Sequence, residues 1–269
     1  MTEMQLTQGV AVVTGAAGGM GAATARALAQ AGYGALLLCD LDPAQLEAVA
    51  APLRAKGAEV SALAGDIADP AFPGELVARL AGRPIAALVH TAGLSPRMGT
   101  AERILEVNLG ATVRLVDAIR GHMAPGSAAV LIASNSAHFP MPPEIAAAFG
   151  QPLPPGGIAA LAQLAPDPVL AYPMSKLGVM ALVKREAKRF GERGARIVSI
   201  SPGAIDTRMV AVEEGNEQLK TMIANQPIPR VGKPEEIAAV AVFLCSASAS
   251  FLTATDVLVD GGMIASAVP

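Results

Sequence analysis

The sequence predicts an α/β protein with a single doubly wound, parallel, seven-stranded sheet and helices on both faces. Short apolar runs alternate along the chain with helix-forming segments, which is typical of strand–helix–strand units with right-handed crossovers. Hydrophobic residues make up 52% of the 269 residues, but aromatic residues make up only 3%. Small aliphatic side chains suit helices that pack closely against both faces of a buried sheet.

The amino-terminal half supplies four of the predicted strands. The first run, GVAVVT, ends in a cluster of glycines, and the helical segment after it closes at Gly32. The second run ends at Asp40, and Pro43 then opens a helix at a position where proline is tolerated. The third run stops at Gly65. These strands are predicted over residues 9–14, 35–39, 60–64 and 85–89, with helices over 22–31 and 43–56.

The carboxyl-terminal half continues the same alternation. Three further strands are predicted over residues 128–133, 196–200 and 256–259, and three further helices over 100–120, 172–190 and 235–245. Because α/β chains of about 250 residues commonly form one domain, we expect residues 1–269 to form a single domain.

Two long segments interrupt the alternation. Residues 139–170 contain eight of the 21 prolines, and residues 206–229 contain the acidic pair Glu213–Glu214. Loops of this length inside a compact domain usually serve as lids or interface elements. We therefore predict a proline-rich insertion at 139–170 and a substrate lid at 206–229.

Composition excludes several classes of protein. A net charge of −3 gives no basic surface for nucleic acid. The apolar run over 237–245 is nine residues long, whereas a bilayer span needs about 18. Residues 1–8 lack the features of a signal peptide, and two cysteines, Cys39 and Cys245, are too few for a disulfide framework. We expect a cytoplasmic protein without a membrane segment or a metal site.

The glycine cluster after the first strand is a candidate phosphate-binding turn. Gly15, Gly19 and Gly21, with Met20 between the last two, stand between the first strand and the first helix. Glycine allows close approach of the main chain to a pyrophosphate, and the helix amino terminus offers free N–H groups to its charge. The alternative is a turn that serves packing alone.

Asp40 strengthens the interpretation of a dinucleotide site. It ends the second strand, where an acidic side chain accepts hydrogen bonds from the adenosine ribose, and Leu41 lies beside it. A 2′-phosphate would face this carboxylate, so NAD is favoured over NADP. The alternative is that Asp40 caps the following helix. Asp66 and Ile67, after the third strand, would lie near the adenine, and a plain turn is the alternative for these two residues.

Tyr172 and Lys176 form a candidate catalytic pair. Their i,i+4 spacing places both side chains on one face of a helix. A tyrosine titrates near pH 10, so its use as a base near neutrality requires a nearby positive charge that lowers its pKa. The alternative is a buried tyrosine beside a lysine whose ammonium reaches solvent.

A serine and an asparagine can join this pair. Ser134 follows the fifth strand, and the carboxyl ends of parallel strands line the ligand crevice, so Ser134 and Tyr172 can converge. Asn108 lies inside the predicted helix 100–120. Ser136 competes with Ser134 for the same role.

Together these residues resemble the short-chain dehydrogenase/reductase family over nearly the whole chain. The resemblance rests on the pattern TGxxxGxG, Asp40, Asn108, Ser134, Tyr172-x-x-x-Lys176 and Ser201-Pro202-Gly203. It implies a Rossmann fold and an NAD-dependent oxidoreductase that interconverts a secondary alcohol and a ketone.

The resemblance also implies residue roles. Tyr172 would be the general base, Ser134 would hold the substrate oxygen, and Asn108 would anchor a water molecule in a proton relay. Lys176 would bind the nicotinamide ribose and lower the pKa of Tyr172. The cofactor would also contact Ala92 and Gly93 after the fourth strand, and Pro202, Gly203, Ile205 and Thr207 after the sixth.

Two features depart from the common family pattern. His90 stands where the family commonly has an asparagine, and we interpret it as structural rather than catalytic. The segment between Ser134 and Tyr172 is much longer than usual, which resembles the bacterial 3α-hydroxysteroid dehydrogenase/carbonyl reductase subgroup. That resemblance implies an altered dimer contact, so we expect a homodimer or a homotetramer.

The predicted substrate is a hydrophobic or steroid-like alcohol or ketone. The alternative function is a non-catalytic NAD-binding sensor or scaffold on the same fold, because a fold alone does not confer activity.

Overall fold

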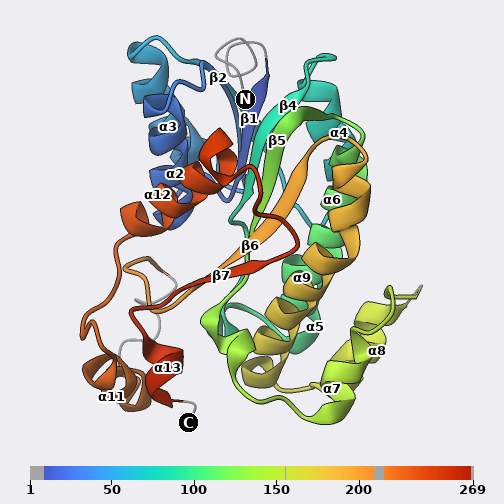
Figure 1. The fold of residues 1–269 in the computed structure, drawn as a ribbon, viewed down its shortest axis with the longest axis vertical. Helices are drawn as coiled ribbons and strands as arrows, with labels where there is room; N and C mark the ends of the chain where they lie inside the picture. The colour runs from blue at the N-terminus through green and yellow to red at the C-terminus, as the bar shows by residue number, and fades with distance from the viewer. Residues whose placement is uncertain (1–8, 155, 209–214, 268–269) are drawn as a thin grey trace.

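Seven parallel strands form one sheet in the order β3-β2-β1-β4-β5-β6-β7 (Figure 1). The structure is a computed structural model and describes residues 9–154, 156–208 and 215–267. The strands are β1 (Val10–Thr14), β2 (Ala35–Asp40), β3 (Glu59–Ala64), β4 (Ile85–His90), β5 (Met123–Ile132), β6 (Arg196–Pro202) and β7 (Asp256–Val259). The strand order reverses between β1 and β4, which is where doubly wound sheets bind ligands. The predicted fold class is confirmed.

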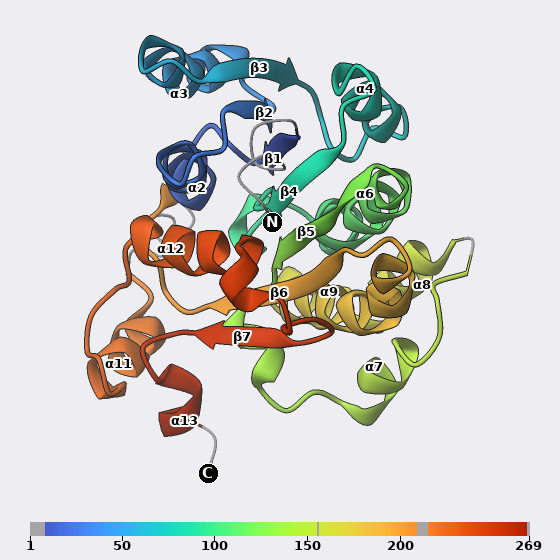
Figure 2. The same ribbon diagram turned by 45° about the horizontal axis from the view of Figure 1, so that its top comes forward.

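Helices cover both faces of the sheet (Figure 2). One face carries α2 (Gly19–Gln30), α3 (Pro43–Ala55) and α12 (Pro234–Cys245). The other carries α4 (Phe72–Arg79), α5 (Ala101–Leu105), α6 (Ala111–Arg120) and α9 (Pro168–Gly191). Shorter elements are α7 (Pro143–Ala148), α8 (Gly157–Leu164), α11 (Glu217–Asn225), α13 (Met263–Ala267), η1 (Pro96–Met98), η2 (Glu106–Gly110), η3 (Asn135–His138) and η4 (Ala247–Ala249).

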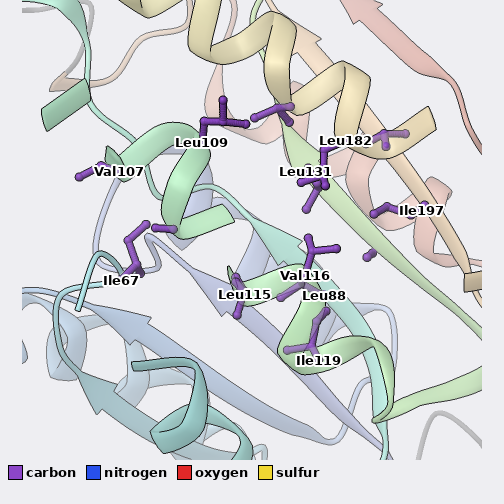
Figure 3. Close-up of a cluster of buried hydrophobic side chains, with 14 of the residues drawn as sticks. Ile67, Leu88, Val107, Leu109, Leu115, Val116, Ile119, Leu131, Leu182 and Ile197 are labelled. Carbon is purple, nitrogen blue, oxygen red and sulfur yellow. The ribbon is translucent and has the colours of Figure 1, made fainter. Parts of the chain in front are cut away.

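Alternate residues of each central strand enter different cores. Val12 of β1 lies in the cluster beneath α4, α6 and α9, whereas Ala11 and Val13 lie in the cluster beneath α2 and α12. Figure 3 shows part of the first cluster, in which Leu88 and Leu131 of the sheet lie among aliphatic side chains of the helices. Both faces of the strands are buried, which explains why their sequences are continuous apolar runs.

Three predicted helices differ from the observed ones by more than one residue, and the first is α2, which begins at Gly19 rather than at residue 22. Helix α9 begins at Pro168 rather than at residue 172, because the carboxylate of Asp167 accepts a hydrogen bond from Val169 N (2.8 Å) and proline fits the first helical position. The predicted helix 100–120 contains a π-helical turn, η2, between α5 and α6. Asn108 lies in this turn, so the local geometry around it is not that of a regular helix.

The segment 139–170 is not a plain loop. It contains α7 and α8, and Ile145, Leu161 and Ala165 are buried in the same core as α5 and α9. These short helices bury too few residues to leave a clear periodic pattern in the sequence. The segment 206–229 contains α11, while residues 209–214 lie outside the described part of the chain.

None of the helices in the described ranges has the length and apolar content that a bilayer span requires.

Candidate active site

Two adjoining clefts lie at the carboxyl ends of the strands. The first, of about 270 Å³, runs along the glycine turn, and Leu94 lines it. The second, of about 460 Å³, is lined by Ser95 and by the ends of β5 and α9. Predicted cofactor-binding residues that line the first cleft are Gly15, Gly19, Met20, Gly21, Asp40, Leu41, Asp66, Ile67, Ala92, Gly93 and Thr207.

The glycine turn depends on the absence of side chains. Gly15 and Gly19 have positive φ angles of 69° and 50°. A Cβ atom on Gly21 would overlap the carbonyl oxygen of Gly15, so this position requires glycine. Helix α2 has no side-chain cap and no acidic residue in its first turn. Its amino-terminal N–H groups are therefore suited to an anionic ligand, as predicted for the pyrophosphate.

Asp40 connects the end of β2 to the glycine turn. Its carboxylate accepts hydrogen bonds from Ala17 N (2.8 Å) and Leu41 N (2.7 Å). The alternative role as a helix cap is wrong, because Asp42 caps α3 by accepting from Ala44 N (2.9 Å). Asp40 is thus held in place by main-chain N–H groups where it lines the first cleft.

Two arginines of the first cleft were missed in the sequence analysis. Arg103 donates to Asp66 Oδ2 (2.6 Å), and Asp66 also accepts from Ala68 N (2.9 Å) as in a turn. Arg208 also lines the cleft. Hydrogen bonds from Gln45 are the main cause of the lowered pKa of Asp42, and the positive charge of Arg208 lowers this pKa slightly further. Both arginines are distant in sequence from the glycine turn, so no local motif could reveal them.

Tyr172 and Lys176 share one face of α9, as predicted. The Lys176 ammonium lies 5.9 Å from the centre of the Tyr172 ring and donates to the carbonyl of Ile132 (2.9 Å). Lys176 is 5% exposed, and this burial lowers its pKa to about 8. Gly93 lines the first cleft, and a Cβ atom on it would lie 3.4 Å from Lys176 Nζ. The ammonium therefore lies close to this part of the first cleft.

Ser134 and Tyr172 both line the second cleft and form a hydrogen bond. Burial raises the pKa of Tyr172, and the bond with Ser134 offsets part of this rise. The net direction is opposite to the decrease that we expected from Lys176, because removal of the phenolate from water is the larger effect.

Ser136 is a partner of Ser134 as well as its competitor. Its N–H and its hydroxyl both donate to Ser134 Oγ, at 3.2 and 3.0 Å. Ser134 Oγ therefore accepts two hydrogen bonds, and its own proton is available to donate to Tyr172 or to a bound oxygen.

The short helix η3 that carries Ser136 is anchored to the sheet. His138 Nε2 lies 2.9 Å from Asp256 Oδ2, and Ser199 Oγ donates to Asp256 Oδ1 (2.6 Å). These contacts join η3 to β6 and β7 and thereby fix the position of Ser134.

Asn108 is buried and does not line either cleft. Its side chain accepts from Leu94 N (2.8 Å) and donates to Leu94 O (3.0 Å) and Ser175 Oγ (3.1 Å). These bonds connect the π-turn to the segment after β4 and to α9. The predicted role in holding a water molecule stays a prediction, and the contacts assign Asn108 a positioning role.

His90 is structural in its contacts, as interpreted. Thr112 Oγ1 donates its proton to Asn108 O (2.8 Å), so it accepts from His90 Nε2 (2.8 Å). His90 Nδ1 then accepts from Thr14 Oγ1 (2.6 Å). Burial, together with the charge of Lys176, lowers the pKa of His90 to about 3, so the ring is neutral.

The segment after β6 only partly matches the prediction. Gly203 lines the second cleft, and a Cβ atom there would lie 2.8 Å from Asp260 Cα. The side chain of Ile205 is buried in the core, so a contact with a carboxamide would have to come from its main chain. Pro202 is buried at the end of β6 and lines neither cleft.

The second cleft combines apolar walls with a few polar groups. Most of its residues were not identified from the sequence, because they come from segments that meet only in the fold. They include Pro96, Arg97, Val169, Pro173, Asn216, Gln218, Leu219 and Met263. The rule that strand ends line the crevice could have indicated the first two.

No group of three or more potential metal ligands occurs among the residues that the structure describes.

Comparisons with known proteins agree with this geometry. Residues 9–148 match the family model for short chain dehydrogenases, and residues 158–264 match that for enoyl-(acyl carrier protein) reductases. Cis-4-hydroxycyclohexanecarboxylate dehydrogenase of Sinomonas cyclohexanicum is 33% identical over 95% of this chain and 96% of its own. Galactitol 2-dehydrogenase of Rhizobium johnstonii is 31% identical, and the match covers 94% of this chain and 93% of that protein.

A similar solved structure is a blue fluorescent protein from a metagenomic library in complex with NADPH. It has a TM-score of 0.77 and 26% identity, and the match covers 96% of this chain and 99% of that one. These relatives support an oxidoreductase and do not support the alternative of a non-catalytic sensor or scaffold.

Proposed function

Because the chain belongs to the short-chain dehydrogenase family, we propose that it interconverts a secondary alcohol and a ketone with NAD as cofactor. The observation that carries this proposal is that Ser134 and Tyr172 line the second cleft together, while the Lys176 ammonium lies 5.9 Å from the centre of the Tyr172 ring. A sugar-alcohol dehydrogenase and a ring-alcohol dehydrogenase among the relatives support the same class of reaction.

The first cleft fits a dinucleotide. Its glycines leave room that side chains would fill, and the uncapped amino terminus of α2 offers N–H groups to a pyrophosphate. Asp40 would accept from the ribose hydroxyls, Asp66 and Ile67 would lie beside the adenine, and Gly93 and Thr207 would lie toward the nicotinamide. When bound, the nicotinamide would take a hydride from the alcohol carbon or return it to the ketone.

Tyr172 moves the proton in this mechanism. In the oxidation it accepts the proton of the substrate hydroxyl, and in the reduction it donates a proton to the forming alkoxide. Ser134 donates a hydrogen bond to the substrate oxygen, since its own oxygen already accepts from Ser136. Lys176 places a positive charge beside the phenol and stabilises its ionised form. The raised pKa of Tyr172 favours proton donation at neutral pH, so we expect the oxidation to become faster as pH rises.

NAD is favoured over NADP because a 2′-phosphate would face the carboxylate of Asp40. Arg208 lines the same cleft, and its positive charge would attract a 2′-phosphate and so favour NADP. We expect the ratio of kcat/KM for NAD to that for NADP to exceed one, and Asp40→Ala to lower it about tenfold. A ratio below one for the wild type would contradict the assignment of Asp40.

The substrate is expected to be a hydrophobic alcohol or ketone, ring-shaped or steroid-like. Val169, Leu219, Met222 and Met263 supply apolar walls to the second cleft, and methionine adapts to irregular shapes. Helix α11 carries two of these residues, which supports a lid role for 206–229. A homodimer or homotetramer, a cytoplasmic location and one NAD-binding domain over 1–269 stay predictions from the sequence.

Tyr172→Phe tests the proposal. It keeps the ring but removes the group that transfers the proton, so formation of NADH from cyclohexanol and other ring alcohols should fall by about three orders of magnitude. Absorbance at 340 nm follows the reaction. Tyr33→Phe is the matched control, because Tyr33 is the other of the two tyrosines and its hydroxyl donates to Cys245 O (3.3 Å) away from both clefts. Equal rates for wild type and Tyr172→Phe would refute the assignment.

A further inference from the structure

A buried amide adjoins the reacting end of the second cleft. Asn135 directly follows Ser134, opens η3 and lines the same cleft as Tyr172. Consecutive Cα atoms lie about 3.8 Å apart, so Asn135 is placed beside the hydroxyl that would hold the reacting oxygen. Asn135 is 8% exposed and takes no part in the proposed proton and hydride transfer. A polar side chain buried to this extent requires hydrogen-bond partners.

Met263 sets the orientation of this amide. Asn135 Nδ2 lies 3.4 Å from Met263 Sδ. A thioether accepts hydrogen bonds but cannot donate them, so the NH₂ group faces the sulfur and the carbonyl oxygen points elsewhere. Met263 is itself 3% exposed, and Asp260 fixes the main chain around it by accepting from Gly262 N (2.9 Å) and Ile264 N (2.8 Å). The amide is therefore held by an ordered part of the chain.

The oxygen of the amide is left for a ligand. Asn135 Oδ1 accepts no hydrogen bond from the residues in the described ranges. It is also not one of the fully buried polar atoms that lack a partner, so it keeps access to the cleft that Asn135 lines. An amide oxygen only accepts hydrogen bonds, so its partner has to be a donor such as a hydroxyl group.

The remaining walls limit where a polar group of the substrate can lie. Val169, Leu219 and Met263 present apolar side chains to the cleft. A substrate hydroxyl against these walls would lose its hydrogen bonds to water without replacement, which is unfavourable. A hydroxyl beside Asn135 would instead find an acceptor. The cleft therefore suits a hydrocarbon body with its polar groups gathered at the end that reacts.

We propose that the substrate is a vicinal diol with an apolar body, and that its second hydroxyl donates to Asn135 Oδ1 while Ser134 and Tyr172 bind the reacting oxygen. The two oxygens are on neighbouring carbons because the residues that bind them are neighbours in the chain. In the oxidation, one carbinol carbon gives a hydride to NAD and its hydroxyl gives a proton to Tyr172. The product is an α-hydroxy ketone. This inference rests on the proposed function, and it makes Asn135 a residue that determines specificity.

Two isomeric diols test the proposal. We would measure kcat/KM with NAD for trans-cyclohexane-1,2-diol and trans-cyclohexane-1,4-diol, which differ only in the position of the second hydroxyl. The wild type should prefer the 1,2-diol about fivefold, the effect of one neutral hydrogen bond. Asn135→Leu should abolish this preference, because leucine has a similar size but no acceptor. Asn135→Asp should keep it, because a carboxylate also accepts. The ratio within one protein cancels changes at Tyr172 that affect both substrates alike.

Two further variants serve as a control and as a second test. Gln30→Leu makes the same kind of change at the exposed end of α2, where the residue lines neither cleft, and should leave the ratio within about twofold of the wild type. Met263→Leu keeps Asn135 but removes the sulfur that orients it, so the preference for the 1,2-diol should fall about twofold. A ratio that is equal in the wild type and in Asn135→Leu would overturn the proposal.

A binding measurement separates this proposal from the proposed function. Protein loaded with NADH cannot oxidise an alcohol, so calorimetry can measure the affinity for each diol without turnover. Tighter binding of the 1,2-diol by about fivefold in the wild type, and equal binding of both diols by Asn135→Leu, would support the proposal even if no alcohol were oxidised. Equal binding of the two diols by the wild type would overturn it, even if ring alcohols were oxidised with NAD and the proposed function held.

Discussion

The first cleft is built around a glycine turn, whereas the second cleft is lined mainly by residues with side chains from separate segments. Gly15, Gly19 and Gly21 come from one turn, and their spacing alone brings the main chain to the surface of the first cleft. Arg97 and Leu219 of the second cleft are separated by more than a hundred residues along the chain. A cleft of the first kind is specified by a local motif, and a cleft of the second kind exists only once distant segments have packed together.

Gly21→Ala should have the largest effect, because it adds a side chain to the glycine turn that lines the first cleft. The new Cβ would overlap the carbonyl oxygen of Gly15, so the turn would have to open. We expect NAD affinity, measured by calorimetry, to fall by about two orders of magnitude and the melting temperature to decrease.

Gly74→Ala is the control for this change. Its Cβ would meet no atom within 4 Å, and Gly74 lies on α4 and lines neither cleft. NAD affinity should stay within about twofold of the wild type. If both variants bound NAD alike, the first cleft would not depend on close approach of the main chain.

The pH dependence of stability tests the burial of His90 at the end of β4. The pKa of His90 is about 3 in the folded protein, against 6.5 when exposed. The unfolded chain therefore binds more protons between these values, and the free energy of unfolding falls as pH falls through this window. We expect a loss of roughly 2 kcal/mol between pH 7 and pH 5, measured by urea unfolding.

His90→Asn should reduce this slope, because asparagine does not titrate. The comparison uses the difference between the two pH values for each protein, since the variant also changes the bonds to Thr14 and Thr112. A slope unchanged in the variant would mean that other groups cause the acid sensitivity.

Ser136→Ala should have the smallest effect, and it tests the second cleft. It removes the hydroxyl that donates to Ser134 Oγ (3.0 Å), while the donation from Ser136 N remains. The loss of one neutral hydrogen bond is worth about 1 kcal/mol, so kcat should fall about fivefold with little change in KM.

A double-mutant cycle shows whether Ser136 acts through Ser134. In a Ser134→Ala background, Ser136→Ala should cause no further loss of kcat. An equal loss in both backgrounds would show that Ser136 contacts the substrate independently.

The strands and the glycine turn could be predicted because their signals are local. All seven predicted strands occur. The central strands were the clearest in the sequence, since parallel strands buried on both faces leave continuous apolar runs. The i,i+4 spacing placed Tyr172 and Lys176 together correctly because helix geometry alone determines which side chains share a face.

Other features could not be predicted because they depend on contacts between distant residues. The insertion 139–170 folds into α7 and α8 because Ile145 and Leu161 find buried positions against α5 and α9. The π-turn at Asn108 gives that side chain its bonds to Leu94 and Ser175. The rise in the pKa of Tyr172 follows from burial, which the spacing of Tyr172 and Lys176 does not reveal.

The sequence by itself determined the fold class, the family, the glycine turn and the pairing of a phenol with an ammonium. The turn and the pairing follow from residues within a few positions of one another, the fold class follows from the regular alternation of strands and helices, and the family follows from the order of several short motifs along the chain. The tertiary structure decided that Ser136 supports Ser134, that Asp42 rather than Asp40 caps α3, and that Arg97 enters the second cleft. Such contacts arise when separate segments pack, because only packing sets the distances between residues that are far apart in the chain.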